Sequence, residues 1–243
     1  MNLPSLSTLD QQRFGVVTAK YNLQAGDSID GALAWCGAQS VAMLIVRCDS
    51  KMLAQVQRLE QAGCRLMDTL VYYRKTRLDD TFPALPEGYR SRLAVAADGD
   101  AVEALAGRTF AGYMGHYHAD PRLAAGDADL VYSSWAGSSC RSAAVADAVI
   151  LIESAGEIAA FATLKVHDDK QFEGVLFGVS PDHQGKRLYA ALMQLAQQWG
   201  RARAYTEMLV STQLTNLAVQ KVWCRQGFEP ASSLYTFHRW FDH

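Results

Sequence analysis

A strand that leads through a tight polar loop into a helix is the feature that most limits how this sequence can fold. In residues 175–192, VLFGVSPDHQGKRLYAAL, an apolar run ends at Pro181 and apolar residues at helical spacing resume a few positions later. A helix N-terminus presents unpaired N–H groups and a positive dipole end, which together attract an anion. Gly185 lets a ligand approach the backbone, and Lys186 and Arg187 add positive charge. The segment predicts a pyrophosphate site, although a solvated surface turn would have the same residues.

The rest of the chain is expected to alternate strands with helices, which is typical of a layered α/β protein. Short apolar or β-branched runs predict strands at residues 13–23, 40–48, 66–75, 91–96, 149–154, 157–166, 172–180, 206–212 and 232–241. Apolar residues at helical spacing predict helices at residues 52–59, 101–112, 186–204 and 217–226. The uncharged run at residues 31–46 predicts the end of a further helix followed by a buried strand. Two prolines, a glycine and three acids between Leu78 and Tyr89 have the composition of a linker. We therefore expect a smaller domain at residues 1–85 and a larger one at residues 90–243.

A weak internal repeat connects the two expected domains. A helix, a glycine and a strand follow one another around Gly63 and again around Gly227. Leu70 and Leu234 stand at the same distance after these two glycines. Duplication of a half-domain explains the repeat, and so does chance, because helix–glycine–strand is a common unit.

Charge and composition exclude some classes of partner. The 243 residues include 23 Lys and Arg against 25 Asp and Glu, a formal charge of −2. A main partner such as nucleic acid or an anionic membrane would favour a basic face, so neither is expected. The N-terminus lacks the pattern of a secretory signal, and the longest uncharged run, residues 31–46, is too short and too polar to cross a bilayer. The five cysteines form no C-x-x-C pair, which favours a reducing compartment, and we expect a cytoplasmic protein.

Two segments together resemble the GCN5-related N-acetyltransferases, the GNAT superfamily. The first, similar to the acyl-CoA loop of that family, is Val179-x-Pro181-x-x-Gln184-Gly185-Lys186. The second, similar to its closing helix and last strand, is Asn216-x-x-Val219-x-x-x-Trp223-x-x-x-Gly227-Phe228. The resemblance covers residues 90–243 and implies a GNAT fold, in which helices flank a mixed central sheet.

The resemblance also implies acetyl-CoA as the co-substrate and assigns its contacts. Backbone groups of the strand before the loop would bond the pantetheine arm, and the loop amides would hold the pyrophosphate. The asparagine before the last helix would touch the cofactor. The residues assigned in this way are Phe177, Gly178, Val179, Gln184, Gly185, Lys186, Arg187, Leu188, Tyr189, Asn216 and Trp223.

Three of these positions depart from the family pattern. Arg187 stands where the family prefers Gly, and Tyr189 where it prefers Gly or Ala. A positive φ would strain Arg187, whereas a helical Arg187 would add a phosphate partner, and we expect the helical alternative. Trp223 stands where many members have a tyrosine that protonates the departing thiolate, and an indole N–H is a donor with no accessible proton to give. Tyr235 is the first candidate for that acid and Tyr189 the second, with ordinary aromatic packing as the alternative for both.

The whole chain is similar to nucleotide-sugar acetyltransferases related to bacterial TDP-fucosamine acetyltransferase. Those pair a truncated, cofactor-free GNAT-like half-domain with a full domain, as residues 1–85 and 90–243 would here. The matching features are Phe14-Gly15 before the first strand, the internal repeat, and the segment FAGYMGHYHADPRL at residues 110–123. In relatives that segment lies over the acceptor site, so Tyr113, Tyr117 and Asp120 are expected to bind the acceptor, a nucleotide-linked amino sugar of surface-polysaccharide biosynthesis.

The expected reaction is direct attack of a primary amine on the thioester in a ternary complex. A base must first take a proton from the ammonium, and the candidates are His118, His116 and Glu173. A backbone N–H near Val179 would hold the thioester oxygen. His-x-His with a nearby Asp could instead bind a metal ion, but no further ligand stands at a recognisable spacing, so no metal is expected.

Other acceptors and other classes of function stay open. The acceptor could be another small amine, such as a polyamine or an aminoglycoside, or a protein N-terminus. Trp223 favours a catalytically weak acyl-CoA-binding module, and a scaffold with a decayed loop is the remaining class. A nucleotide-sugar acceptor requires a second anion site between the domains, for which the candidates are Arg13, Arg74, Arg92 and Arg122. The oligomeric state is open too, a homodimer included.

Overall fold

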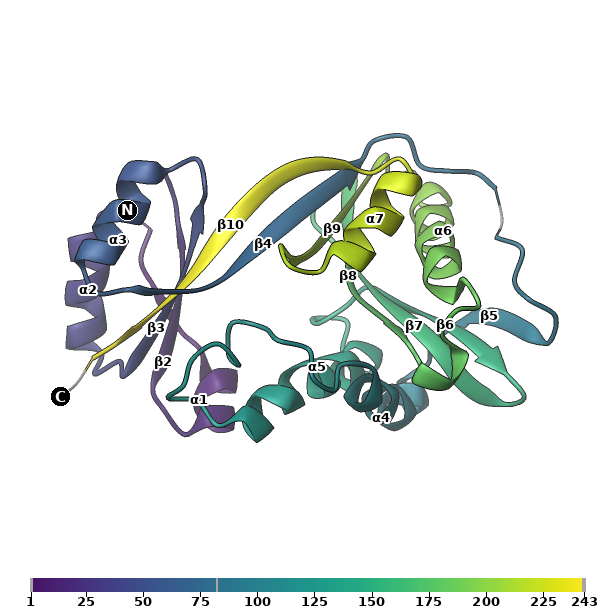
Figure 1. The fold of residues 1–243 in the computed structure, drawn as a ribbon, viewed down its shortest axis with the longest axis horizontal. Helices are drawn as coiled ribbons and strands as arrows, with labels where there is room; N and C mark the ends of the chain where they lie inside the picture. The colour runs from purple at the N-terminus through teal and green to yellow at the C-terminus, as the bar shows by residue number, and fades with distance from the viewer. Residues whose placement is uncertain (1, 82, 242–243) are drawn as a thin grey trace.

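A mixed sheet of ten strands runs through the molecule, and helices cover both of its faces (Figure 1). The computed structural model describes residues 2–81 and 83–241, and within them the strand order is β1-β2-β3-β10-β4-β9-β8-β7-β6-β5. The predicted α/β class with a mixed central sheet is confirmed. Among the described residues, no helix has the length and apolar character needed to span a membrane.

The elements follow one another along the chain with these bounds. The strands are β1 (Ser5–Leu6), β2 (Thr18–Leu23), β3 (Met43–Asp49), β4 (Arg65–Lys75), β5 (Tyr89–Leu93), β6 (Ala148–Ser154), β7 (Glu157–Val166), β8 (Gln171–Val179), β9 (Glu207–Gln213) and β10 (Glu229–Trp240). The α-helices are α1 (Thr8–Phe14), α2 (Ile29–Ala38), α3 (Leu53–Gln61), α4 (Gly99–Thr109), α5 (Ala125–Arg141), α6 (Leu188–Arg201) and α7 (Leu217–Arg225). Two short 3-10 turns are η1 (Ala96–Asp98) and η2 (Pro181–His183).

The same succession of elements occurs twice, as β2-α2-β3-α3-β4 in an N-terminal half and as β8-α6-β9-α7-β10 in a C-terminal half. Gly26 and Gly185, with φ of 86° and 76°, each precede the first helix of their half by three residues. Gly63 and Gly227, with φ of 78° and 76°, each follow the second helix. A left-handed residue is a common helix stop that glycine adopts without strain. The sequence repeat therefore corresponds to two halves with the same order of strands and helices and with left-handed glycines at matching positions.

The long strands of the two halves lie side by side in the middle of the sheet. β4 and β10 are antiparallel neighbours, and Leu70 pairs with Leu234, the two leucines that match in the sequence repeat. β10 also pairs with β3 of the N-terminal half, and β4 with β9 of the C-terminal half. Each half thus completes its sheet with a strand from the other (Figure 1). The segments 1–85 and 90–243 are joined through one continuous sheet.

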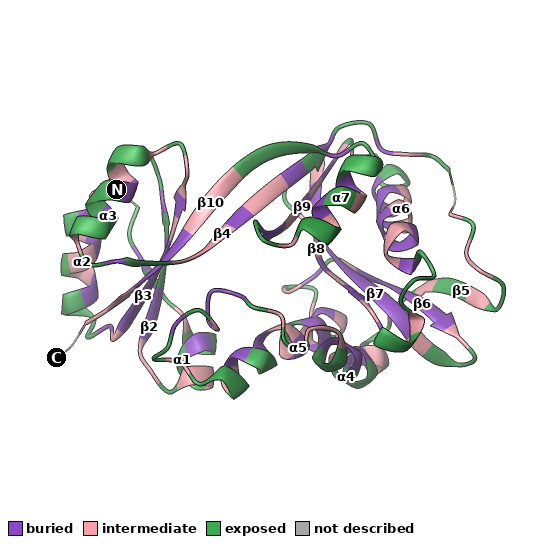
Figure 2. Cartoon of the chain, viewed as in Figure 1, coloured by how far each residue is buried: buried purple, intermediate pink, exposed green. Residues whose placement is uncertain are grey.

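Each half has its own apolar core, visible as buried stretches along the helices and strands (Figure 2). In the N-terminal half, α2 and α3 bury Cys36 and Leu59 against β2, β3 and Phe237 of β10. In the C-terminal half, α6 packs on one face of β6–β8, and Leu192 is fully buried there. α4 and α5 cover the opposite face with residues such as Leu105. Helices on both faces hold the strands that position the site.

The sequence patterns do not predict α1 and α5. α1 lies where the first strand was expected to begin, so β2 starts at Thr18 instead of residue 13. Ser7 caps this helix through Asp10, whose N–H lies 3.4 Å from Ser7 Oγ, and Gly15 ends it with a φ of 70°. α5 is rich in serine and glycine, which have weak helix propensity. Its packing against α4 and the sheet stabilises it instead.

Candidate active site

β8 and β9 separate towards their carboxyl ends. The two parallel strands pair only over Gln171–Gly174 and Glu207–Val210. β8 then continues to Val179 along β7, with Val175 as an extra residue in the ladder. On their β9 side, residues 175–179 have no strand partner in the described chain, so their backbone groups can bond an extended ligand. We call this opening between residues 175–179 of β8 and the end of β9 the wedge.

The loop after β8 forms the expected strand–loop–helix turn at the mouth of the wedge. A Cβ placed on Gly185 would meet nothing within 4 Å, so open space lies beside its backbone. Residues 184–187 are exposed, whereas Leu188 is buried and offers only its backbone N–H. The free N–H groups of the first turn of α6 suit a pyrophosphate. The loop therefore fits the anionic part of acetyl-CoA.

Arg187 lies outside the helix, as the N-cap of α6, with φ 62° and ψ 17°. This is the left-handed region, which costs a residue other than glycine about 1–2 kcal/mol. The expectation that Arg187 is helical is wrong, because the chain keeps the backbone conformation that suits glycine at this position. The Arg187 side chain is exposed. Next to it, Lys186 Nζ lies 2.9 Å from Tyr89 Oη.

Tyr189 and Trp223 form a hydrogen-bonded pair beside the wedge. The indole N–H of Trp223 donates to Tyr189 Oη at 3.0 Å. The ring of Tyr189 lies 5.6 Å, centroid to centroid, from that of Phe177 on β8. Burial raises the pKa of Tyr189, so its hydroxyl is protonated at neutral pH. Because the indole donates this hydrogen bond, the phenol proton itself is free for another acceptor.

A cavity of about 770 Å³ is lined by residues of both halves. At the wedge, its lining includes Asn216, whose Nδ2 donates to Thr212 Oγ1 at 3.0 Å. From the N-terminal half, it includes the side chains of Arg13, Lys20 and Arg47. The cavity therefore extends from the expected thioester position to a part of the N-terminal half that contributes these three cationic side chains and the carboxylates of Asp10 and Asp68.

Eight of the eighteen residues that the sequence assigns to the site line this cavity. They are Tyr113, His116, Tyr117, Glu173, Phe177, Tyr189, Asn216 and Trp223. Gly178 packs on β7, where an added Cβ would lie 2.3 Å from the Phe161 ring. Val179 ends β8 and packs against the C-terminal core. The structure thus gathers the cofactor strand, the loop segment 110–123 and α7 around one space.

The segment between α4 and α5 bridges the two halves. Tyr113 Oη lies 3.3 Å from Thr212 Oγ1 at the end of β9. Tyr117 Oη donates to Asp10 Oδ1 of α1 at 2.8 Å. Asp10 also forms an ion pair of 2.6 Å with Lys20. The segment therefore extends from the wedge to the N-terminal half.

Asp120, expected to contact the substrate, is instead covered by protein partners and is 2% exposed. Its Oδ2 accepts from His238 Nδ1 at 2.7 Å and from the Trp240 indole at 2.8 Å, and its Oδ1 accepts from the Arg122 N–H at 3.0 Å. Burial alone would raise the pKa of this carboxyl, but the hydrogen bonds from His238, the Arg122 amide and Trp240 lower it to about 2. His238 Nε2 in turn lies 2.8 Å from His116 Nδ1.

The other two candidate bases have different surroundings. His118 does not line the cavity: its Nε2 lies 3.1 Å from Asp129 Oδ1, and its Nδ1 accepts a backbone N–H at 3.3 Å. Glu173 lines the cavity, with Oε1 accepting from Ser211 Oγ at 3.2 Å and Oε2 2.9 Å from His167 Nε2. The three candidates are therefore not brought together at one point.

Tyr235, the first candidate for the acid, lies on the other face of β10. It packs against the core of the N-terminal half, with its ring centroid 6.3 Å from that of Phe237. It is not among the residues that line the cavity. Of the two phenols considered for the acid, only Tyr189 lies beside the wedge.

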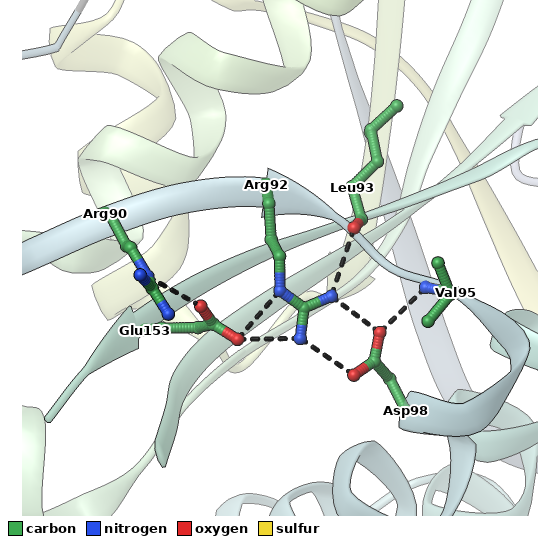
Figure 3. Close-up of polar contacts among 6 residues, drawn as sticks. All are labelled: Arg90, Arg92, Leu93, Val95, Asp98 and Glu153. Carbon is green, nitrogen blue, oxygen red and sulfur yellow. Dashed lines mark hydrogen bonds and ion pairs between the residues drawn. The ribbon is translucent and has the colours of Figure 1, made fainter. Parts of the chain in front are cut away.

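Arg92 belongs to an ion-pair cluster around β5, at the edge of the sheet (Figure 3). Its guanidinium lies 2.7 Å from carboxylate oxygens of both Asp98 and Glu153, and Arg90 also contacts Glu153, at 3.0 Å. The bonds to Asp98 and Glu153 raise the pKa of Arg92. The cluster connects β5, β6 and η1, so Arg92 has a structural role away from the cavity.

Only one of the four arginines considered for a second anion site lines the cavity. Arg122 stacks on the Trp240 ring at 4.1 Å, and Arg74 lies 3.8 Å from Glu207. Arg13 lines the cavity, together with Lys20 and Arg47, which the sequence patterns did not single out. Within residues 2–81 and 83–241, no three His, Cys, Asp or Glu side chains are grouped as metal ligands.

Comparison with known proteins identifies the half that contains the wedge. Residues 114–228 match the model of the acetyltransferase (GNAT) family. This part of the chain, just under half of its length, is similar to the GNAT acetyltransferases. The members of this family are acyl-CoA N-acyltransferases, and acetyl-CoA is the co-substrate that they use. No curated protein shows significant sequence similarity to the chain.

Solved structures share the fold over most of the chain. A GCN5-related N-acetyltransferase from Sphaerobacter thermophilus has a TM-score of 0.63 at 14% identity, over 87% of this chain and 66% of that protein. A tandem GNAT protein from the clavulanic acid biosynthesis pathway has a TM-score of 0.62 at 14% identity, over 93% and 76%. A GCN5-related N-acetyltransferase from Kribbella flavida has a TM-score of 0.62 at 14% identity, over 93% of this chain and 82% of that protein. The tandem protein supports the description of this chain as two GNAT-like halves.

Proposed function

We propose that this GNAT domain transfers the acetyl group of acetyl-CoA to the primary amine of a nucleotide-linked amino sugar. The observation that carries the proposal is the continuity of the cavity, which extends from the wedge to the cationic side chains of the N-terminal half. An acceptor with an amine at one end and phosphates at the other fits such a space. A cytoplasmic role in surface-polysaccharide biosynthesis belongs to the same proposal.

One acetyl-CoA site per chain is expected, because the N-terminal half differs at both elements of the site. β2 and β3 stay paired over Thr18–Leu23 and Met43–Cys48, so no wedge opens between them. In the turn before α2, Asp27 and Ser28 stand where the C-terminal half has Lys186 and Arg187, and Asp30 follows in the first turn of α2. Carboxylates at this position repel a pyrophosphate. The N-terminal half therefore serves the acceptor and not a second cofactor.

Arg47 is the best candidate to hold the anionic part of the acceptor. Lys20 pairs with Asp10, and Arg13 Nη2 donates to Ser134 Oγ at 2.6 Å. The backbone of Arg47 pairs within the sheet, but its side chain forms no hydrogen bond or ion pair with the described residues. A guanidinium binds phosphate through paired, charge-assisted hydrogen bonds.

A structural neighbour supports the amino-sugar class. The glucosamine N-acetyltransferase region of a fungal multi-domain GH3 β-N-acetylglucosaminidase has a TM-score of 0.62 at 14% identity, over 97% of this chain and 31% of that protein. Its described activity is acetylation of an amino sugar. For the present chain, this neighbour makes the amino-sugar acceptor a reasonable first choice.

The chemistry needs only groups that lie around the cavity. The amine attacks the thioester carbonyl, a C–N bond forms, and the C–S bond breaks as the CoA thiolate leaves. Backbone N–H groups of residues 175–179 would hold the carbonyl oxygen, and Tyr189 would give the thiolate its proton. The proton that the nitrogen loses as the amide forms would restore the Tyr189 hydroxyl. No covalent enzyme intermediate is required. Cys36, Cys48 and Cys64 are accordingly free to serve as buried apolar residues of the N-terminal half.

The proposal is tested first by calorimetric titration with acetyl-CoA and with CoA, and then by thiol release with a panel of amines. The panel contains nucleotide-linked amino sugars, the same sugars without the nucleotide, spermidine, an aminoglycoside and a peptide N-terminus. We expect 1:1 binding of acetyl-CoA and the highest kcat/KM with a nucleotide-linked sugar. Binding without any transfer would favour an acyl-CoA-binding module, and an absence of binding would contradict the acetyltransferase assignment.

Arg47→Gln separates the acceptor part of the proposal from the cofactor part. Loss of charge-assisted hydrogen bonds, each worth about 1.5–3 kcal/mol, should raise KM for the nucleotide-linked sugar at least about tenfold. The free amino sugar lacks the phosphates, so its KM should stay within about twofold, as should the acetyl-CoA affinity. An equal loss with both acceptors would contradict a phosphate contact at Arg47.

A further inference from the structure

The acceptor ammonium must lose a proton before it can attack, and an acceptor atom that no other residue bonds is the simplest place for that proton. His118 has partners at both nitrogens, and Glu173 at both oxygens. His116 uses Nδ1 for His238, and no other described residue bonds its Nε2. His116 lines the cavity and is 8% exposed. Among the three candidate bases it is the one with a free acceptor atom.

The partners behind His116 determine which of its nitrogens carries the proton. The Trp240 indole can only donate, so the Asp120 oxygen that it shares with His238 is an acceptor. His238 Nδ1 therefore carries a hydrogen. A neutral His238 then accepts at Nε2, and His116 must donate from Nδ1. This arrangement leaves the lone pair of His116 on Nε2, the atom without a protein partner.

We propose that His116 Nε2 takes the proton of the acceptor's ammonium group, with His238 and Asp120 behind it as a buried proton relay. The inference rests on the proposed function, because it requires an amine acceptor. An N–H bond of the ammonium breaks as the bond to His116 Nε2 forms, and His116 passes its Nδ1 proton to His238 Nε2. The positive charge then lies on His238, beside the Asp120 carboxylate. The amine keeps its electron pair for the new C–N bond.

The surroundings of His116 agree with this role. Tyr113, three residues earlier, contacts Thr212 at the end of β9, so the segment that carries His116 reaches the edge of the wedge. Tyr117 packs on the imidazole at 3.9 Å between ring centroids and restricts its orientation. Besides the titratable Tyr117, the charged or titratable groups that act on His116 include His238, Arg47, Lys20 and His118. Burial, followed by the effect of His238, holds the pKa of His116 well below its usual value, so the ring is an unprotonated base at neutral pH.

The tautomers can be measured without knowing the acceptor, by ¹⁵N NMR of the imidazole nitrogens in the full chain near neutral pH. His116→Gln and His118→Gln assign the signals. We expect His116 to carry hydrogen on Nδ1 only and His238 to carry it on Nδ1. In Asp120→Asn, the amide can also donate, so both rings should populate the opposite tautomer. Hydrogen on Nε2 of His116 in the wild-type protein would overturn the relay.

The catalytic role is tested by transfer to the best acceptor of the panel. His116→Ala should lower kcat on the order of 10²-fold, with the acetyl-CoA affinity within about twofold, and added imidazole should restore part of the rate. Asp120→Asn, a change at a positioning residue, should lower kcat less and shift the acidic limb of the pH profile. A purely structural role for Asp120 would leave the shape of that profile unchanged.

His118→Ala is the matched control, because the structure places His118 outside the cavity and against Asp129. Its kcat should stay within about twofold of wild type. Full activity of His116→Ala, or a larger loss with His118→Ala, would overturn the assignment of the base. Absence of transfer to every amine by the wild-type protein would instead contradict the proposed function, and the NMR experiment would still decide the state of the relay.

Discussion

At the scale of single residues, the site depends on contacts between positions far apart in the sequence. The segment 110–123 is rich in aromatic, His and Asp residues, which was enough to single out His116 and Asp120. The residue that joins them, His238, is 122 positions from His116 and 118 from Asp120. The position of His238 depends on the pairing of β10 with β3 of the N-terminal half, and no local sequence pattern predicts that pairing. Arg47 escaped notice for the same reason, because it reads as one charged residue at the end of a buried strand.

Tyr189 provides the first test at this scale. Tyr189→Phe removes the hydroxyl that we assign to protonation of the CoA thiolate and keeps the ring that packs on Phe177. We expect kcat to fall on the order of 10²-fold with little change in acetyl-CoA affinity, measured by thiol release and by calorimetry.

As a control, Tyr189→Ala combined with Trp223→Tyr moves a phenol to the helix position where the family has its tyrosine. This double variant should be more active than Tyr189→Ala alone, and an unchanged rate in Tyr189→Phe would exclude the hydroxyl from the reaction.

At the scale of elements, the sequence predicts what local chemistry determines. Strands β6 to β9, α6 and the turn at Gly185 follow from apolar periodicity and from one glycine, and the structure has them. α5 escapes prediction because its serines and glycines favour no helix, and only contacts with α4 and the sheet stabilise it. Arg187 shows the same limit on a smaller scale. Its left-handed backbone is required by the turn, against the preference of the residue itself.

The turn before α6 can be tested against its counterpart before α2. Gly185→Ala and Gly26→Ala each place a side chain at a positive φ, with no atom within 4 Å of the added Cβ. Each should destabilise the fold by about 1 kcal/mol, seen as similar decreases in Tm. Only Gly185→Ala should weaken acetyl-CoA, by about tenfold, because the pyrophosphate is expected at that turn alone. Equal effects of the two variants on acetyl-CoA affinity would contradict the assignment of the loop.

At the scale of the whole molecule, β4 and β10 make the two halves one unit. The sequence repeat indicates two similar halves, and the Pro- and Gly-rich segment between Leu78 and Tyr89 suggests that they are separate. The exchange of strands argues against separate halves. The part of the sheet in each half includes a strand from the other half, and would lack that strand without it. Pairing between strands so distant in sequence depends on the complete fold. The cavity has the same origin, since its lining comes from both halves.

This coupling predicts that damage to the N-terminal core unfolds the acetyl-CoA site as well. Phe237→Ala empties a position that is 1% exposed in that core, on a strand paired with both Val46 and Leu66, and should cost about 3–5 kcal/mol. Circular dichroism should show a single thermal transition at a lower temperature, and saturating acetyl-CoA should raise the whole transition. Phe172→Ala, in the core of the C-terminal half, is the matched control and should give the same single transition. Two transitions in Phe237→Ala, with acetyl-CoA raising only the later one, would show that the halves fold independently despite the shared strands.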